Sequence, residues 1–511
     1  MRGPSLRLGH PAPRFGTRSS RRLGGLALLG AMTCMGMAGC WANQTRWQRD
    51  SEIDGVTRKD GESEAEAMYR AGVTCMDVHE RDDCAIEYFE KIVERNPKDR
   101  AIAGDSMFRL IELYRRAGRE EDATMLMRKF WDVGTDRKQT GNLPYPARWL
   151  PKDLDTVFSV DLGRFADSGL SRSLSEDALD SLFTCDPERR KQLEDEREAR
   201  RAAKLEAKLA AMSPEEREAY EAERAEREAE REARRQAREE KEPEGEPTYD
   251  VGSCELARAL GFKDLREWTR LTSALNVFQP ERSAAIFGVP RVETHLAAAV
   301  EAGRLIAPEA GAEIAIYTLP PFEPAAGEGD SNRPGPDDAG AKKQRYEDFR
   351  VAVLDLDTLV LARAEVLDEV IANKAAGEIT FSPSGRALAE RVPKDVTFFT
   401  IMSPEAMKRG MAGAGALASL LPEPEGMLFA AVTYDYAGLF VRIPTSNPLK
   451  AALLLSLVKT ALDATEDERD AEDDPGLRAI EKLDVSQTPD GGALQMTTVL
   501  TPEDINAILR D

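Results

Sequence analysis

The chain has few of the residues that most often carry chemistry. Histidine occurs three times in 511 residues, and six cysteines include no C-x-x-C pair. Zinc and haem sites are built mainly from those two residue types. The sequence also contains no G-x-S-x-G, P-loop, glycine-rich dinucleotide loop or H-E-x-x-H motif. These absences predict a protein that is not an enzyme and that carries neither cofactor nor metal.

A long hydrophobic run is missing as well. The apolar run at residues 23–38 has 16 residues, whereas a membrane-spanning helix needs about 20. Six arginines and no acidic residue precede it within residues 1–22. A basic segment followed by a short apolar run is typical of a secretory signal. We therefore expect export, with residues 1–39 as the signal peptide.

The apolar run ends at Met37-Ala38-Gly39-Cys40, which resembles the lipobox of bacterial lipoproteins. The resemblance implies cleavage before Cys40 and lipidation of that cysteine, and so a membrane partner. An Asp after the cysteine favours inner-membrane retention in that family. Trp41 stands there, which favours the outer membrane with the protein facing the periplasm. A plain signal peptide or an uncleaved anchor is the alternative.

Positive charge is scarce relative to negative charge. The net charge is −22, and removal of the six arginines of residues 1–39 makes it −28. Such a surface repels phosphate backbones, so we expect no nucleic-acid partner.

Four cysteines remain besides Cys34 in the signal and Cys40, and they suggest two disulfides in an exported chain. Cys75 and Cys84 flank one turn, and Cys185 and Cys254 flank a charged segment. We expect each pair to form a disulfide.

Residues 40–61 are polar and predict a flexible tether. Residues 62–135 carry apolar positions at helical spacing and resemble tetratricopeptide repeats, which are helix–turn–helix units of about 34 residues. The residues that carry the resemblance are Ala85, Phe89, Pro97, Tyr114, Gly118, Ala123 and Met127. The resemblance implies a concave surface for a protein partner. A four-helix segment without that groove is the alternative.

A charged run at residues 186–246 predicts a helical insertion with acid–base pairs four residues apart. Ser213-Pro214-Glu215-Glu216 is a helix-start signal and divides the insertion into two helices. The run has no sustained apolar seam, which favours a solvated arm over a coiled coil. A partner-binding role for this arm is the other possibility.

On either side of the arm, alternating apolar residues predict strands that are interspersed with helices. Residues 147–185 plus 250–390 form a first α+β half, and residues 391–511 form a second. In each half the same tripeptide, Pro151-Lys152-Asp153 or Pro393-Lys394-Asp395, leads into the first strand. We expect an α+β fold with antiparallel sheets and an internal duplication.

Residues 147–511, with patterns such as DTLVLARAEVLDEVI, resemble duplicated ectodomains of unknown function in bacterial exported proteins. That resemblance implies no catalytic residue. The leading hypothesis is a non-catalytic cell-envelope lipoprotein that binds other envelope proteins through its helical repeats. The alternative is a periplasmic module that binds a lipid or another apolar ligand between sheets and helices.

We predict that Cys40→Ala releases the protein from the membrane, because several acyl chains at about 0.8 kcal/mol per methylene supply the anchorage. Mass spectrometry of the N-terminal peptide from fractionated membranes checks this. An unmodified N-terminus in the wild type would contradict it.

Overall fold

The computed structural model describes most of the chain beyond residue 56. The described residues are 57–59, 61–96, 100–134, 147, 149–151, 155–220, 222, 225, 229, 253–275, 282–308, 314–320, 349–376, 383–393, 395–412, 424–467, 479 and 481–510. The signal segment at 1–39, Cys40, most of the tether and the end of the arm lie outside them.

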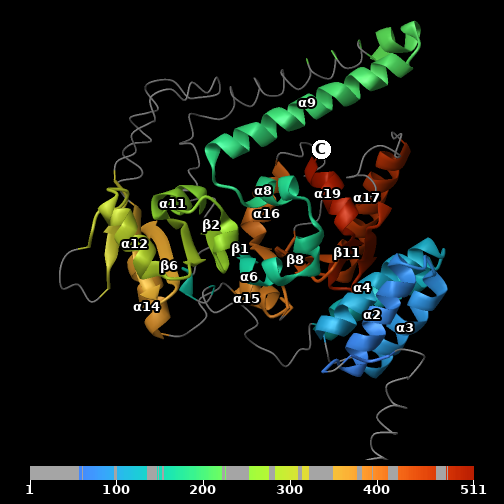
Figure 1. The fold of residues 1–511 in the computed structure, drawn as a ribbon, viewed down its shortest axis with the longest axis horizontal. Helices are drawn as coiled ribbons and strands as arrows, with labels where there is room; N and C mark the ends of the chain where they lie inside the picture. The colour runs from blue at the N-terminus through green and yellow to red at the C-terminus, as the bar shows by residue number, and fades with distance from the viewer. Residues whose placement is uncertain are drawn as a thin grey trace, which may run out of the picture.

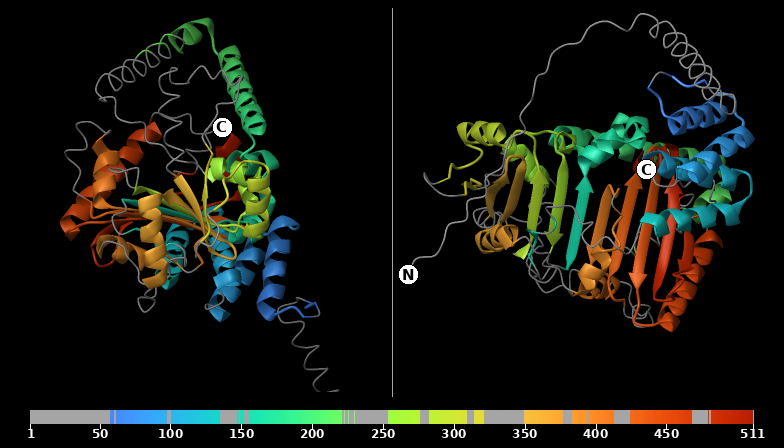
Figure 2. Two further views of the ribbon diagram at one scale, coloured as in Figure 1. Left: turned by 90° about the vertical axis from the view of Figure 1, so that its left-hand side faces the viewer. Right: turned by 90° about the horizontal axis from the view of Figure 1, so that it is seen from below.

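Within these residues, eleven strands form one antiparallel sheet (Figures 1 and 2). The order across the sheet is β10 (Asp484–Gln487), β11 (Ala493–Leu500), β9 (Ala437–Pro444), β8 (Met427–Thr433), β7 (Phe398–Met402), β1 (Thr156–Asp161), β2 (Arg270–Leu275), β3 (Ala284–Gly288), β6 (Thr358–Arg363), β5 (Phe349–Asp355) and β4 (Ile316–Thr318). The expectation of a mixed α+β fold with antiparallel strands is confirmed.

The two sequence halves meet inside this sheet. β1 of the first half pairs antiparallel with β7 of the second half. Alternation along both strands explains the pairing, because Val157 and Phe399 face one buried layer while Phe158 and Phe398 face the opposite side. The sequence pattern indicated strands in each half, and their union into one continuous sheet is a finding of the structure.

Helices cover both faces of the sheet (Figure 2). One face packs against α14 (Ala364–Ala376), α15 (Pro383–Ala389) and the N-terminal helices. The other face packs against α11 (Ser253–Leu260) and α12 (Val292–Glu301) in the first half, and against α16 (Pro404–Ala412) and α17 (Pro448–Asp467) in the second. Further short elements are α6 (Leu162–Asp167), α7 (Gly169–Ser173), α8 (Glu176–Phe183), η3 (Leu265–Glu267) and α19 (Pro502–Arg510).

The N-terminal helices form a unit in which each helix packs against the next. They are α2 (Glu64–Asp77), α3 (Asp82–Arg95), α4 (Arg100–Arg116) and α5 (Glu120–Gly134). A capping box between Ser63 and Glu66 starts α2. We call α2–α5 the helical unit.

The helical unit shares its core with the second half of the sheet. Trp131 of α5 stacks on Phe440 of β9 with ring centroids 4.9 Å apart. A Cβ atom at Gly438 would lie 2.3 Å from Cζ of Phe108. The missing side chain at Gly438 therefore allows α4 to lie directly on the sheet.

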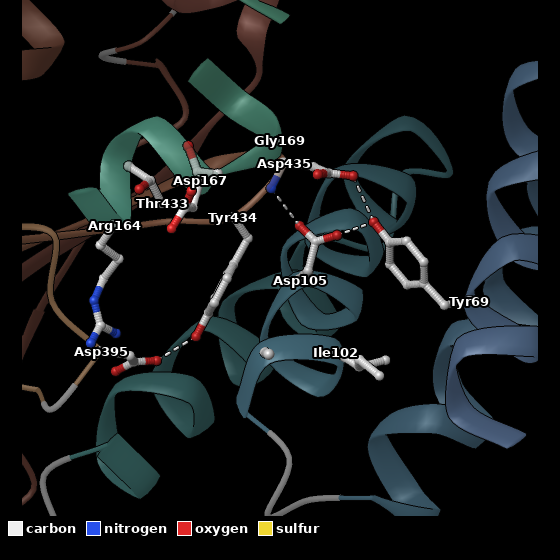
Figure 3. Close-up of a pocket in the computed structure, with 12 residues that line it drawn as sticks. Tyr69, Ile102, Asp105, Arg164, Asp167, Gly169, Asp395, Thr433, Tyr434 and Asp435 are labelled. Carbon is white, nitrogen blue, oxygen red and sulfur yellow. Dashed lines mark hydrogen bonds between the residues drawn. The ribbon is translucent and has the colours of Figure 1, made fainter. Parts of the chain in front are cut away.

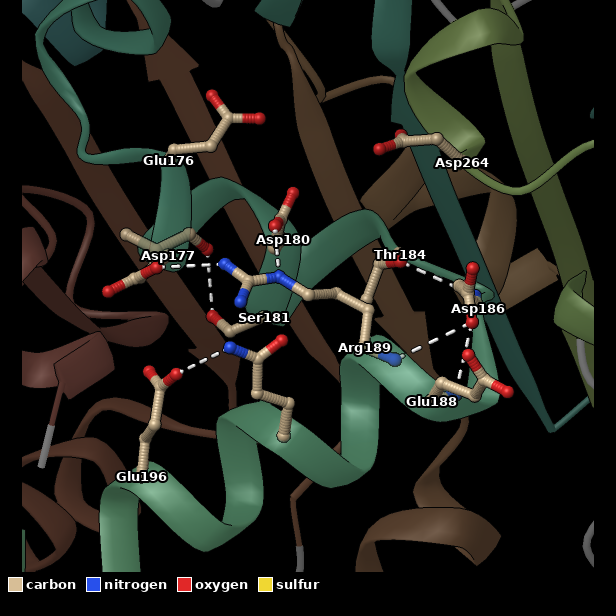
Figure 4. A network of polar contacts seen from close by, with 12 residues as sticks. Glu176, Asp177, Asp180, Ser181, Thr184, Asp186, Glu188, Arg189, Glu196 and Asp264 are labelled. Atoms are coloured by element: carbon tan, nitrogen blue, oxygen red, sulfur yellow. Dashed lines mark hydrogen bonds and ion pairs between the residues drawn. The ribbon is translucent and has the colours of Figure 1, made fainter.

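The charged arm begins at α9 (Pro187–Ala211), which Asp186 caps through the backbone N–H groups of Glu188 and Arg189. Arg189 also donates to Asp177 at 2.9 Å and to Asp180 at 2.7 Å, which fixes the first turn of α9 against α8 (Figure 4). The expected start of a second helix in the arm is present. The backbone N–H of Ser213 donates to the side chain of Glu216, and the backbone N–H of Glu216 donates to the side chain of Ser213.

We predict that Trp131→Ala lowers the free energy of unfolding by about 3–5 kcal/mol, because it leaves a cavity between the helical unit and the sheet. Met125→Ala is the matched control, since Met125 lies on the same helix and is 62% exposed. Urea titration of both variants measures the difference. Equal stability of the two variants would show that the stacking contact is unimportant.

Candidate functional site

A cavity of about 350 Å³ lies where the helical unit meets the sheet. Three parts of the chain form its walls (Figure 3): helices α2 and α4, the α6–α7 segment, and the turn between β8 and β9 together with Asp395. The lining residues are Tyr69, Ala101, Ile102, Asp105, Arg164, Asp167, Ser168, Gly169, Asp395, Thr433, Tyr434 and Asp435. The site therefore depends on segments that are more than 300 positions apart.

One wall of the cavity is a buried ion-pair network, which we call the junction network. Arg109 of α4 donates from Nη2 to Asp435 at 2.5 Å and from Nε to the hydroxyl of Tyr69 at 2.8 Å. The backbone N–H of Asp435 donates to Asp105 at 3.0 Å. The guanidinium also lies over the rings of Tyr69 and Tyr436, 5.5 and 5.2 Å from their centroids. The β8–β9 turn is thus held on helices α2 and α4.

Close packing around the β8–β9 turn leaves no room for a side chain at two neighbouring glycines. A Cβ atom at Gly169 would lie 1.6 Å from a carboxylate oxygen of Asp435. A Cβ atom at Gly104 would lie 2.7 Å from the ring of Tyr434. Both glycines let the turn approach its neighbours, so the wall of the cavity is set by backbone positions as well as by charges.

The junction network shifts the pKa values of its members. Burial raises the pKa of Asp105 to about 6, and the Asp435 carboxylate acts in the same direction, whereas Arg109 and Tyr69 oppose it. Burial also raises the pKa of Tyr69 above its ordinary value. Burial by itself lowers the pKa of Arg109, but Tyr69 and Asp105 outweigh it, so Arg109 stays charged.

The charges that face the cavity are mostly negative. Among its described lining residues, four are aspartates and one is an arginine, Arg164. Asp395 accepts a hydrogen bond from the hydroxyl of Tyr434, and Figure 3 shows Arg164 pointing toward Asp395. The ring of Tyr434 and the side chain of Ile102 add apolar surface. The lining therefore combines carboxylates, one guanidinium and apolar surface.

The four cysteines lie elsewhere. The structure joins Cys75 to Cys84 across the turn between α2 and α3, with Cα atoms 5.8 Å apart. It joins Cys185 to Cys254 at the base of the arm, with Cα atoms 5.0 Å apart. Both Cα separations lie in the range usual for disulfides. Neither pair touches the cavity, and Cys40 lies outside the described residues.

The described part of the chain contains no group of three or more His, Cys, Asp or Glu side chains placed to hold a metal ion. None of its helices is both long and apolar enough to span a membrane.

Sequence reasoning missed the junction network and the cavity. A signal was present, because Asp105 and Arg109 interrupt an apolar helix four positions apart, on a face where the periodicity predicts buried residues. Their partner Asp435 lies 330 positions from Asp105 in a Tyr-Asp-Tyr turn. No local pattern links the two segments, so the sequence could suggest a buried charge but not its partner.

No protein-family model matches the chain, and neither a curated protein nor a solved structure shows significant similarity to it.

The raised pKa of Asp105 predicts a specific pH dependence. The folded state binds the Asp105 proton more tightly than the unfolded state does, since its pKa rises from 3.8 to about 6. The contribution of Asp105 to the free energy of unfolding should therefore fall by about 1–3 kcal/mol as pH rises from about 4 to about 6, and then level off.

The measurement is urea unfolding at pH 4, 5, 6 and 7 for the wild type and Asp105→Asn. The difference between them should carry this slope, because asparagine does not titrate. Asp195→Asn, on the exposed surface of α9, should leave the wild-type slope unchanged. A flat difference, or one that grows with pH, contradicts the assignment.

Proposed function

We propose that this chain is a non-catalytic cell-envelope lipoprotein that mediates protein–protein interactions through its helical unit. Lipidated Cys40 holds it on the outer membrane, facing the periplasm, and its partners are other envelope proteins. The basic segment, short apolar run and Met37–Cys40 motif support the anchor.

In this proposal the helical unit consists of two tetratricopeptide-like repeats. Two hairpins in succession, α2–α3 and α4–α5, support this, as does the burial of the small residues Ala85 and Ala123. Phe89 is fully buried and lies against Gly72 of the preceding helix. A small residue opposite a large one lets the paired helices approach closely, which is how such repeats pack.

We further propose that the two α+β halves arose by internal duplication. Pro151 and Pro393 are 242 positions apart, and so are the first residues of β1 and β7. Phe158 and Thr400 have the same spacing and face each other in the β1–β7 ladder. Antiparallel pairing centred on equivalent residues supports a local two-fold axis at that point.

The strand order supports the same relation. Outward from β1 the sheet runs through β2, β3, β6 and β5; outward from β7 it runs through β8, β9, β11 and β10. Each half also places one helix, α12 or α17, between the strand pair β2–β3 or β8–β9 and the outer strands that follow it. The helical unit packs on the strands of the second half of the sheet. In this proposal, the second copy therefore gained a packing contact with the helical unit that the first copy does not have.

The cavity at the edge of the helical unit is the observation that carries the interaction proposal. The β8–β9 turn contacts the face of α2 and α4 that carries Tyr69 and Arg109, through the junction network. The cavity beside that turn is open, and a partner can reach this face there. The alternative, an apolar ligand such as a lipid, has less support, because carboxylates face the cavity and its volume lies at the lower end of the roughly 300–1,000 Å³ of ligand pockets.

Site-specific photo-crosslinking in intact cells tests this function. A benzophenone amino acid at Ala101, which is exposed at the cavity, should capture one envelope protein reproducibly. The same amino acid at Leu356 is the matched control, because Leu356 is 84% exposed at the β5–β6 turn, toward the opposite end of the sheet. Equal capture at both positions, or none at Ala101, would count against the proposal.

A further inference from the structure

One hydroxyl group of the junction network lies between two carboxyl groups. The hydroxyl oxygen of Tyr69 is within hydrogen-bonding distance of a carboxyl oxygen of Asp105 and lies 2.7 Å from a carboxyl oxygen of Asp435. Both carboxyl groups point toward this hydroxyl in Figure 3. The same oxygen accepts a hydrogen bond from Nε of Arg109 at 2.8 Å. Three polar groups therefore surround a single hydroxyl.

The network is one proton short if both carboxyl groups are ionised. A hydroxyl group carries one proton, so Tyr69 can donate to Asp105 or to Asp435 but not to both. The remaining contact would then place two oxygen atoms against each other with no proton between them. A proton on one carboxyl group removes this repulsion. With Asp105 neutral, its O–H donates to Tyr69, Tyr69 donates to Asp435, and Arg109 is left opposite one carboxylate.

Burial and distance to the guanidinium assign the proton to Asp105. The side chain of Asp105 is 8% exposed, and its nearest contact with Arg109 is 3.6 Å. The side chain of Asp435 is 33% exposed and lies 2.5 Å from Nη2 of Arg109. Ionisation is more costly for the buried group with the more distant countercharge. The raised pKa of Asp105, about 6, agrees with this assignment.

Other titratable or charged side chains near Asp105 come from each element packed around it. They are Tyr434 and Tyr436 in the β8–β9 turn, Arg164 and Asp167 in the α6–α7 segment, Asp395 before β7, and Glu112 and Arg116 further along α4. Among the described residues, none of these hydrogen-bonds to the Asp105 carboxyl group, whose polar contacts lie within the junction network.

The Asp105 carboxyl group also joins the helical unit to the turn. Its Oδ1 accepts the backbone N–H of Asp435 at 3.0 Å, while its Oδ2 contacts Tyr69 of α2. Loss of the proton leaves two carboxylates beside one guanidinium, and their repulsion acts across the contact between α4 and the turn. Asp105 lines the cavity, so its proton can exchange with solvent there.

We propose that the proton on Asp105 is a pH-sensitive latch between the helical unit and the sheet. With the proton in place, the β8–β9 turn is held on α2 and α4. After its loss the turn separates more readily and uncovers the face that carries Tyr69 and Arg109. The latch acts between two parts of this chain, so it does not depend on the proposed function.

The direction of the pH dependence follows from the two states. The closed state binds the Asp105 proton more tightly than the open state, in which solvent reaches the carboxyl group. Closure therefore weakens as pH rises from about 4 to about 6 and then levels off. The latch favours the closed state in acid and the open state near neutral pH.

Hydrogen–deuterium exchange of the full-length chain in a non-ionic detergent tests the latch. The reporter is the backbone amide of Asp435, which donates directly to Asp105. After correction for the intrinsic exchange rate, its protection should fall at least about tenfold between about pH 4.5 and about pH 7. The amide of Val289, which donates to Asp357 at 2.7 Å in the first half of the sheet, should keep its protection. Equal protection of the Asp435 amide at both pH values overturns the proposal.

Two variants of the network connect the effect to the proton. Asp105→Asn has the shape of the neutral acid and can donate to Tyr69 at any pH, so protection of the turn should be equal at both pH values. Asp435→Asn leaves one carboxylate for one guanidinium, so the fall in protection should shrink to less than about threefold. Asp195→Asn, exposed on α9, is the matched control and should keep the wild-type fall.

A fall as large as that of the wild type in either network variant would show that the titrating group lies elsewhere, which overturns the proposal. The Asp435 side chain is only half-buried, so Asp435→Asn keeps the test decisive if Asp105→Asn fails to fold.

Discussion

The arrangement of this molecule depends on one ion pair, between the buried Arg109 of the helical unit and the half-buried Asp435 of the β8–β9 turn. Taking such charges out of water is costly, so the pair persists only because further partners satisfy its remaining donors and acceptors. Tyr69 and Asp105 are those partners, and all four side chains lie where two helices meet a strand turn. We therefore infer that the main effect of this ion pair is to fix the position of the helical unit on the sheet. Its contribution to the stability of either part alone is smaller.

That constraint also creates the candidate site. With the turn fixed on the inner face of α2 and α4, the space beside it becomes a cavity whose other walls come from α6–α7 and Asp395. The face of α2 and α4 that carries Tyr69 and Arg109 thus receives a turn of its own chain. A partner would thus meet a composite surface from both sequence halves and the helical unit, which gives it recognition chemistry that no single element contains.

Strands and helices were accessible from the sequence because their signals are local. Alternation over six residues in Thr156–Asp161 and helical spacing in Asp82–Arg95 each reflect one buried face, and the structure places a strand and a helix there. The charged arm and its restart at Ser213 followed from capping chemistry within four residues. Asp105 and Arg109 gave a weaker signal, as charges on a buried helix face, and the sequence did not reveal that they share one cluster.

By itself the sequence determined the class of the fold, the positions of most elements and the excess of negative charge, since each depends on composition or on neighbours a few residues apart. Only the tertiary structure decided that the halves join through β1 and β7, that the turn at Asp435 docks on Arg109, and that Asp167 and Asp395 face one cavity. The physical reason is distance along the chain. Contacts between residues hundreds of positions apart are selected by the packing of the whole core, and no local preference specifies them.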